Sequence, residues 1–382
     1  MVFCPKIKPE NGRFYMRDER LTKLANILTN YSLQLKKDDI FVIYGSEESI
    51  PLVKEVYRQA ILLGAHPHVR LYIEELDEIF YKHASENQLK FLSPLSKFEV
   101  KNIDARLSIL APKNTKRLTN IDPKKQALHR RFQQEIHRIF LERAAKKELR
   151  WSLTQYPTNA AAQDAEMSIE EYEDFVFKAA HVDEKDPIKY WKKVSKQQEE
   201  IIKILQTKKT LHVFAEDTDL KLRFDGRKWI NADGHENFPD GEIFTGPVEN
   251  SANGYIRYSY PAIYGGREVE DVRLEFKNGK VVKAKAVKGE KFLNAMLDTD
   301  PGARRIGEFA FGNNYGIQKF TKNILFDEKI GGTIHIAVGS GYPETGSKNK
   351  SGIHWDMICD LRKNSEIHAD GEVIYKNGKF II

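Results

Sequence analysis

Cysteine and long apolar runs are what this sequence has least of. Only Cys4 and Cys359 occur among its 382 residues, and they stand at opposite ends of the chain. Two such distant cysteines indicate neither a disulfide framework nor a thiolate metal site, so we expect ordinary reduced thiols. The longest apolar runs, such as residues 60–63 and 334–338, are far shorter than the ~20 residues that cross a bilayer. We therefore expect no membrane partner.

A signal-peptide pattern is also lacking. Residues 1–20 mix Lys, Glu, Asp and Arg without an apolar stretch, so we expect a cytoplasmic protein. With 41% hydrophobic and 30% charged residues, the chain can bury a core and stay soluble. Its length exceeds the ~250–300 residues at which single cores stop growing, which predicts two domains.

The formal charge of +6 is modest for this length, and the most basic stretch is residues 124–150. Apolar residues within it recur at the three-and-four spacing of one helical face, which predicts an amphipathic helix. No aromatic platform interleaves the charges, so a solvated basic face is favoured over an RNA-contacting helix. We therefore expect no nucleic-acid partner.

The first half, residues 1–207, alternates strands with helices. Ser168 and Glu171 form a capping box that begins one helix, and a polar helix at 187–206 ends this half. The other elements are strands at 40–44, 68–73, 106–111 and 151–156 and helices at 49–63 and 75–88. This alternation predicts an N-terminal βαβ domain with a mostly parallel sheet.

The second half, residues 208–382, consists of short alternating strands. Four hairpin signals occur in it: Asp225-Gly226, Asn278-Gly279, Asp370-Gly371 and Asn377-Gly378. We predict a β-rich, metal-binding C-terminal domain, which makes the fold α/β by its first half and α+β overall.

Carboxylates and imidazoles that suit divalent cations gather in this second half. The candidate ligands are Glu242, Glu308, Glu328, His335, His354 and Asp356. Such a carboxylate-rich set with two histidines suits zinc, cobalt or manganese. Two adjacent cations are one way to hydrolyse an amide, because they activate a water and polarise the carbonyl.

The residues around each candidate indicate how strongly it is predicted to be a metal ligand. Glu242 follows the Pro239-Asp240-Gly241 turn at the start of a strand, which could equally expose it. Glu308 leads into a small and apolar stretch, so we expect it to be buried with a metal or an arginine, Arg304 or Arg305, as its partner.

Two strand patterns place the histidines. Alternation puts His335 on the small-residue face of strand 333–338, opposite Ile334, Ile336 and Val338. Spacing of two places His354 and Asp356 on one face of the next strand while Trp355 packs the other. This His-x-Asp pair is the sharpest signal, although a core histidine is the alternative at position 335.

The loop after His335 carries Tyr342. Residues 341–348 resemble a phosphate-binding loop, but Ser347 stands where the lysine must follow, so the motif fails. We interpret it as a flexible active-site rim, with the Tyr342 phenol able to donate to a developing oxyanion. A packed tyrosine before Pro343 is the alternative.

Four ordered motifs together resemble the thermophilic metalloaminopeptidase family, of the aminopeptidase T and S type. They are PDGE at 239–242, ARRIGE at 303–308, HIAVG at 335–339 followed by Tyr342, and IHWDM at 353–357. The resemblance implies a two-metal exopeptidase that removes N-terminal amino acids from peptides with a free N-terminus, acts as a homodimer and accepts zinc, cobalt or related ions.

The same resemblance implies the roles of individual residues. All six candidates would be ligands, Glu308 would bridge both metals, and Tyr342 would be catalytic together with Glu308. Asp327 competes with Glu328 for one ligand position. Either Glu249 or Glu344 could bind the substrate amine.

Two other functions stay open beside the metalloaminopeptidase. A metal-dependent hydrolase of another amide or ester would use the same ligands, and a nucleic-acid-binding α/β protein would use the basic helix at 124–150 instead. We expect the N-terminal domain to wall off the site or to form the dimer contact.

Overall fold

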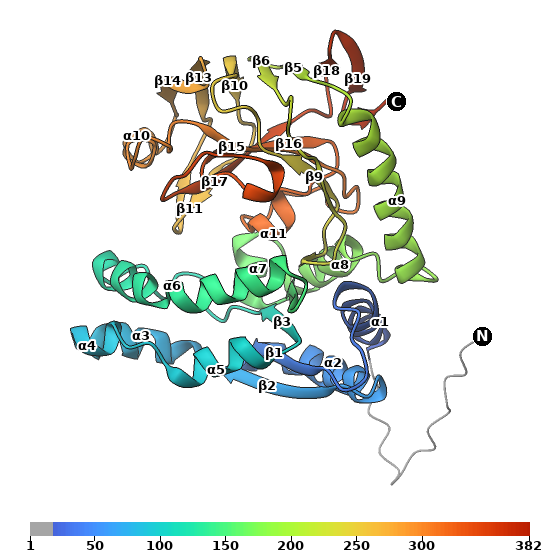
Figure 1. Cartoon of the computed structure of the whole chain (residues 1–382), viewed down its shortest axis with the longest axis vertical. Helices are drawn as coiled ribbons and strands as arrows, with labels where there is room; N and C mark the ends of the chain where they lie inside the picture. Colours follow the sequence, from blue (N-terminus) through green and yellow to red (C-terminus); the bar gives the residue numbers. More distant parts are fainter. Residues whose placement is uncertain (1–17) are drawn as a thin grey trace.

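A computed structural model describes residues 18–382. Cys4 and the charged segment 1–17 lie outside the described residues. Figure 1 shows three layers: N-terminal helices with a parallel sheet, a middle sheet, and a second antiparallel sheet at the far end. Among the described residues, no helix is both long and apolar enough to cross a membrane.

The N-terminal layer is built on a five-stranded, wholly parallel sheet, here sheet A. Its strands, in spatial order, are β2 (His66–Tyr72), β1 (Ile40–Ser46), β3 (Ala105–Leu110), β4 (Arg150–Gln155) and β8 (Asn237–Phe238). The predicted parallel sheet is thereby confirmed. Its last strand, β8, comes from the second half of the chain, and the domain boundary at residue 207 stays a prediction.

Helices cover sheet A on both sides. They are α1 (Glu19–Ile27) with a π-helical turn (Leu28–Ser32), α2 (Ile50–Leu62) after a 3-10 turn (Glu47–Ser49), α3 (Glu74–His83), α4 (Glu86–Leu89), α5 (Pro94–Asn102), α6 (Pro123–Ala145), α7 (Asn159–Asp164), α8 (Ile169–Ala179) and α9 (Pro187–Leu205). The capping box between Ser168 and Glu171 begins α8 as predicted. The basic helix α6 contains no buried residue, which agrees with a solvated face.

Two antiparallel sheets make up the rest of the molecule. Sheet B runs β14 (Lys280–Lys285), β13 (Arg273–Lys277), β10 (Asn253–Arg257), β6 (Thr218–Arg223), β5 (Thr210–Ala215), β18 (Glu366–Ala369), β19 (Glu372–Lys376) and β20 (Lys379–Phe380). Sheet C runs β17 (His354–Asp360), β16 (Thr333–Gly339), β15 (Ile306–Gly312), β9 (Glu242–Thr245) and β7 (Ile230–Ala232). Smaller elements are the β11 (Ala262–Tyr264) and β12 (Arg267–Val269) ribbon, α10 (Glu290–Leu297), α11 (Ile324–Asp327) and a 3-10 turn (Pro343–Thr345).

Three of the four hairpin signals join neighbouring strands of sheet B. Both residues of Asn278-Gly279, Asp370-Gly371 and Asn377-Gly378 have positive φ, as a tight two-residue hairpin turn requires. The Asp225-Gly226 prediction was wrong, because only Gly226 has positive φ and the chain crosses there from sheet B to sheet C.

The largest core lies between sheets B and C. Leu220 and Leu274 of sheet B and Phe309, Ile336 and Trp355 of sheet C are all buried in it. Helix α9 connects this core with that of the N-terminal layer, because Leu205 packs in the first and Trp191 in the second. One face of sheet C is thus committed to the core, and the other face is free to hold a site.

Candidate metal centre

Strand register gathers five of the six candidate ligands on the free face of sheet C. Glu308 on β15 is level with Ala337 on β16, which is level with Asp356 on β17. His335 is level with Ala310, and Glu242 on β9 is level with Gly312. Level residues of antiparallel strands point to the same face, and small neighbours leave room above the backbone for polar side chains.

The opposite face explains why these side chains point where they do. Phe309, Phe311, Ile336, Val338 and Trp355 alternate with the site residues and fill the core shared with sheet B. A one-residue slip of register would expose this whole apolar set. The predicted facing of His335, and of the His354 and Asp356 pair, is confirmed by this alternation.

A β-bulge at Gly307 aims Glu308. Strict alternation would place Ile306 and Glu308 on the same face, but the register shifts by one residue between them. Ile306 therefore enters the core while Glu308 enters the site. Only glycine fits at 307, since a Cβ there would lie 2.2 Å from the Ser340 carbonyl oxygen.

The ligand atoms lie close together. His354 Nε2 is 3.1 Å from Glu308 Oε2 and 3.4 Å from Asp356 Oδ1. His335 Nε2 is 3.7 Å from Glu308 Oε1 and 3.7 Å from Glu242 Oε2. Each oxygen of Glu308 thus faces a different histidine. Two sets have ligand atoms within 4.8 Å of one another: Glu242, Glu328 and His335, and Glu308, His335 and Asp356.

Hydrogen bonds to the backbone orient both imidazoles for metal binding. His335 Nδ1 is 3.0 Å from the Glu328 carbonyl oxygen, and His354 Nδ1 is 2.7 Å from the Ser340 carbonyl oxygen. A proton on each Nδ1 satisfies these carbonyls, so Nε2 is the nitrogen that faces the carboxylates and that would exchange its own proton for a metal ion. Each histidine thus has the hydrogen-bonded carbonyl that a metal-binding imidazole needs at its other nitrogen.

Unsatisfied oxygens test whether the site fits divalent cations. Glu242 Oε2 and Asp356 Oδ1 are buried and accept no hydrogen bond within the described structure. A buried carboxylate oxygen without a donor is costly unless a cation binds it. Carboxylate and imidazole donors are moreover the ligands that zinc, cobalt and manganese take. The residues fit a metal centre.

Mutual charge shifts the pKa values of this cluster. Burial alone would lower the pKa of both histidines, but the carboxylates outweigh it and raise the pKa of His335 to about 10 and of His354 to about 12. Burial would raise the pKa of Asp356, but the charge of His354 holds it at about 2. At Glu242 burial prevails, and its pKa stands well above the usual value. Neighbouring positive charge therefore stabilises the ionised form of Asp356 but does not outweigh burial at Glu242.

Lys329 is a site residue that the sequence analysis missed. Its side chain is fully buried, and its Nζ contacts Glu328 and lies 3.9 Å from Glu242 Oε1. Burial would lower its pKa, but the charges of Glu242 and Glu328 raise the pKa far above the usual value. The signal available in the sequence was the charged run Asp327-Glu328-Lys329, which stands between the apolar residues Phe326 and Ile330.

Asp327 and Glu328 have separate places at the end of α11. Asp327 Oδ1 accepts hydrogen bonds from the Thr321 backbone N–H at 2.7 Å and from its hydroxyl at 2.8 Å. Glu328 instead belongs to the set with Glu242 and His335. The geometry favours Glu328 over Asp327 as the ligand.

Three alternative partners are engaged elsewhere. Arg304 pairs with Asp298 at 2.8 Å, and Arg305 donates to the Glu249 carbonyl oxygen at 2.8 Å, so Glu308 does not use either as its counterion. The Glu249 carboxylate accepts hydrogen bonds from Arg227 Nη2 and from the Lys348 backbone N–H. It is therefore not free for a substrate amine, whereas Glu344 is exposed.

The loop that carries Tyr342 contains hydrogen bonds of its own, and its expected flexibility stays a prediction. Gly341 N–H donates to the Asn349 carbonyl at 3.1 Å, and Thr345 Oγ1 donates to the Tyr342 carbonyl at 2.7 Å. Tyr342 as a whole residue is 39% exposed, and the centroid of its ring lies 5.1 Å from that of His354. Burial of the phenol and nearby carboxylates raise its pKa, so it stays protonated and able to donate.

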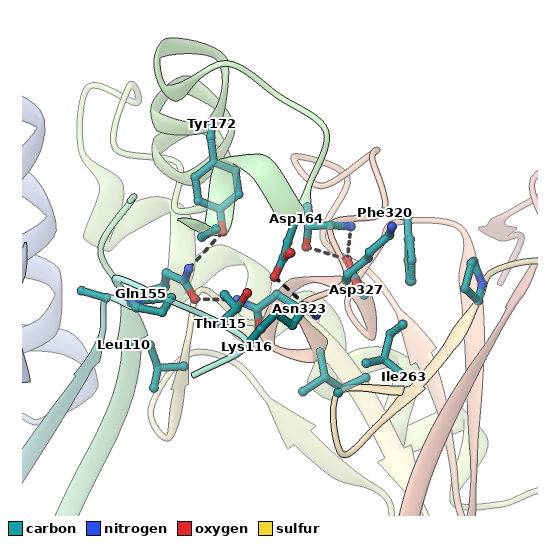
Figure 2. A pocket seen from close by; sticks show the side chains of 18 of the residues that line it. Leu110, Thr115, Lys116, Gln155, Asp164, Tyr172, Ile263, Phe320, Asn323 and Asp327 are labelled. Carbon is teal, nitrogen blue, oxygen red and sulfur yellow. Dashed lines mark hydrogen bonds and ion pairs between the residues drawn. The ribbon is translucent and has the colours of Figure 1, made fainter. Parts of the chain in front are cut away.

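A cavity of about 450 Å³ adjoins the cluster where sheet C faces sheet A (Figure 2). Asp356 and Ile358 of β17 line it from one side, and Leu110 and Gln155, at the carboxyl ends of β3 and β4, from the other. A pocket beside such strand ends is where α/β folds bind ligands. The N-terminal layer therefore forms one wall of the cavity. The sequence analysis expected the N-terminal domain to wall off the site or to form the dimer contact, and the cavity wall is consistent with the first of these.

A family comparison decides the class of protein. The family described as thermophilic metalloprotease (M29) matches residues 17–380. The chain belongs to this family. The resemblance seen in the four motifs is confirmed, and with it the expected enzyme class: an M29 protein is a metal-dependent peptidase, a hydrolase of peptide bonds.

Individual relatives agree with the M29 assignment over nearly the whole chain. Aminopeptidase 2 of Geobacillus stearothermophilus is 27% identical over 95% of this chain and 95% of its own length. Aminopeptidase T of Thermus thermophilus is 27% identical over 94% and 95%. The solved structure of wild-type AmpT from Thermus thermophilus matches with a TM-score of 0.83 at 24% identity, covering 95% of this chain and 99% of that one. The predicted mixed α/β fold is confirmed.

Proposed function

We propose that this protein is an aminopeptidase that uses two divalent metal ions to release N-terminal amino acids from peptides. The observation that carries the proposal is Glu308, whose two oxygens face two histidines on adjacent strands at 3.7 and 3.1 Å. A carboxylate placed in this way suits a bridging ligand. The names of the relatives, aminopeptidase 2 and aminopeptidase T, support the exopeptidase activity.

Six residues would hold the two cations. Glu242, Glu328 and His335 would contribute one side of the centre, and His354 and Asp356 the other, with Glu308 shared between them. When bound, divalent ions lower the pKa of water towards neutrality and polarise the scissile carbonyl. Zinc, cobalt and manganese all suit this donor set.

The residues of this chain have defined tasks around that chemistry. Tyr342, protonated at neutral pH, would donate a hydrogen bond to the negative charge that develops on the carbonyl oxygen. Buried Lys329 offsets the charge of Glu242 and Glu328 from behind. The core face of sheet C keeps the donors rigid, which two-metal chemistry needs.

The decisive experiment is hydrolysis of aminoacyl p-nitroanilides, each with its N-acetylated control, after chelation and after zinc, cobalt or manganese is restored. An aminopeptidase cleaves only the free-amine substrates, and only with metal. Equal cleavage of the acetylated controls would indicate instead a metal-dependent hydrolase of another amide or ester. Metal titration against activity tests the number of ions.

Two further expectations belong to this proposal. A homodimer is supported by exposed apolar side chains on and beside α5: Leu95 is 81% exposed, Phe98 69% and Phe91 62%. Light scattering measures the oligomeric state, and replacing Leu95 and Phe98 with Ser and Gln should yield monomers. A cytoplasmic location stays a prediction from the sequence.

A further inference from the structure

The cavity beside the metal centre contains chemistry that the centre itself does not use. Its volume of about 450 Å³ is within the range of pockets that enclose drug-sized ligands, and one amino-acid side chain would not fill it. Asp356 is both a proposed ligand and part of the cavity wall, so the cavity adjoins the centre on the side of this residue. A peptide with its scissile bond at the centre could extend into it.

The cavity offers partners for peptide backbone. Asn323 Nδ2 donates to Gln155 Oε1 at 2.5 Å, and Gln155 Nε2 donates to the Tyr172 hydroxyl at 3.0 Å (Figure 2). Each amide group keeps one further N–H for a ligand. Leu110 and Ile324 add apolar surface, being 36% and 48% exposed although they line the cavity.

Two ammonium groups, one from each half of the chain, also line the cavity. Lys116 follows β3, and its Nζ lies 3.9 Å from Asp164 Oδ2, beyond hydrogen-bond distance. Lys322 precedes α11, and its Nζ lies 3.3 Å from Glu166, a side chain that is 80% exposed, and 3.9 Å from Glu268. Such loose, solvated ion pairs contribute little to stability and can exchange for an anionic ligand.

The backbone conformation of Lys322 is fixed by its neighbours, and it is one of twelve described residues other than glycine with a positive φ. Its φ of +61° is in the left-handed region, which costs a residue other than glycine roughly 1–2 kcal/mol. Both neighbours are anchored, Thr321 by Asp327 and Asn323 by Gln155. The anchored neighbours therefore fix the direction in which the Lys322 side chain leaves the backbone. This also gives buried Asp327 a task other than metal binding.

We propose that this cavity binds the part of the peptide that follows the scissile bond, and that Lys322 and Lys116 bind its terminal carboxylate. The inference rests on the proposed aminopeptidase function and adds a substrate class: short peptides with a free C-terminus. The cavity is also lined by Arg117 and by four carboxylates, those of Glu74, Asp164, Asp327 and Asp356. Asp164, the ion-pair partner of Lys116, works against an anion there and limits the preference.

The test compares three tripeptides that share leucine and glycine as first residues: a free acid ending in glycine, its C-terminal amide, and an amide ending in aspartate. We expect wild type to have a kcat/KM about tenfold higher for the free acid than for either amide, as one charge-assisted contact supplies. The readout for each variant is the ratio of kcat/KM for the free acid to kcat/KM for the glycine amide. A loss of folded protein or of metal lowers both values equally and cancels in this ratio.

Four variants sharpen the result. Lys322→Gly removes the charge and suits the left-handed backbone, so the ratio should fall towards one, whereas Lys322→Arg should retain it. Lys116→Gln should lower the ratio, and Asp164→Asn should raise it. Equal cleavage of acid and glycine amide by wild type, or an unchanged ratio in Lys322→Gly, overturns the carboxylate site.

Two remaining outcomes are also decisive. In the first, the aspartate amide is cleaved as well as the free acid, and both are cleaved better than the glycine amide. The cavity would then bind a side-chain carboxylate as readily as a terminal one, which overturns the proposal. Failure to cleave any peptide or aminoacyl p-nitroanilide would overturn the aminopeptidase function itself, and this inference with it.

Discussion

Sheets A and C border the same cavity but place their polar side chains differently. In sheet C the candidate ligands Glu308, His335 and Asp356 stand within strands, on one face of the sheet. In sheet A, Tyr72 and Gln155 reach the cavity from the carboxyl ends of β2 and β4.

The physical cause is how each sheet is covered. A parallel sheet needs helical crossovers that bury both faces, so only its strand ends reach a ligand. Antiparallel sheet C buries one face against sheet B and leaves the other for polar groups. The candidate metal ligands are therefore positioned by strand register, whereas the side chains of sheet A that line the cavity lie at strand ends, and substitutions in the two sheets should have separable effects.

The largest effect is expected from Glu308→Gln. Losing one negative charge from the shared ligand should lower metal content and reduce kcat/KM by more than the ~10–100-fold that loss of a supporting group behind a ligand costs. Elemental analysis after dialysis, with steady-state kinetics, measures both. Exposed Glu275 on sheet B is the matched control, and Glu275→Gln should behave as wild type. A metal content equal to that of the wild type in Glu308→Gln would contradict the proposal that Glu308 is a ligand shared by two metal ions.

Removing the buried cation should destabilise the metal-free protein next most. Lys329→Met leaves Glu242 and Glu328 without their counter-charge, and breaking a buried ion pair costs about 3–5 kcal/mol. Added metal supplies positive charge, so the loss should be smaller with zinc than with chelator. Chemical denaturation under both conditions gives the two values. Lys363→Met, at an exposed position, is the control, and equal losses in both conditions would count against the assigned role.

The two faces of β16 should separate stability from function. Ile336→Ala creates a cavity on the core face and should cost about 2–5 kcal/mol in free energy of unfolding. Its neighbour His335 faces the site, so the folded Ile336→Ala variant should retain metal content and kcat. Loss of metal at temperatures where the variant is still folded would show that the faces are coupled.

At the end of sheet A, a substitution should affect substrate and not metal. Gln155→Met removes the amide between Tyr172 and Asn323 at similar volume, and should raise KM for peptides about 3–10-fold. Metal content should stay at the wild-type value. Gln163→Met, at an exposed position of α7, is the control. If Gln155→Met instead lowered the metal content and left KM unchanged, the end of sheet A would support metal binding and not substrate binding, contrary to the comparison.

The smallest effect concerns a polar pair near the end of sheet A, away from both sites. The hydrogen bond to Asp233 raises the pKa of His235; burial would raise the pKa of Asp233, but the hydrogen bonds from His235 and Ser195 lower it. The histidine's contribution to stability is complete below its unfolded pKa of 6.5 and is lost as pH rises through the higher folded value. That of Asp233 is present above 3.8 and is lost as pH falls through its lowered value.

Together these two groups stabilise the fold most between about pH 4 and 6.5. His235→Gln should therefore cost less than about 1 kcal/mol at pH 6, since the side chain is 32% exposed, and less still at pH 8.5. Urea denaturation at both pH values measures the difference in free energy of unfolding between wild type and variant. A gap that widens at pH 8.5 would contradict the assigned pKa direction.

Local patterns predicted the elements of both sheets well, and long-range contacts account for what was missed. Period-two alternation predicted the faces of His335, His354 and Asp356 correctly, because a strand with one buried face leaves little choice. Alternation could not reveal the bulge at Gly307, which depends on the close approach of Ser340. Nor could it choose between Asp327 and Glu328, since that depends on Thr321.

Residue types and spacing alone determined the donor chemistry, the parallel and antiparallel halves and the family motifs, since each of these depends on neighbours within a few positions. The tertiary structure decided which residues meet. It brought Lys329 between two carboxylates, sent Arg304 and Arg305 to other partners, and set Lys116 and Lys322 around one cavity. Such encounters depend on how the chain packs in three dimensions, at sequence separations as different as 6 residues for Arg304 and Asp298 and 87 for Glu242 and Lys329, and strand or helix periodicity does not encode them.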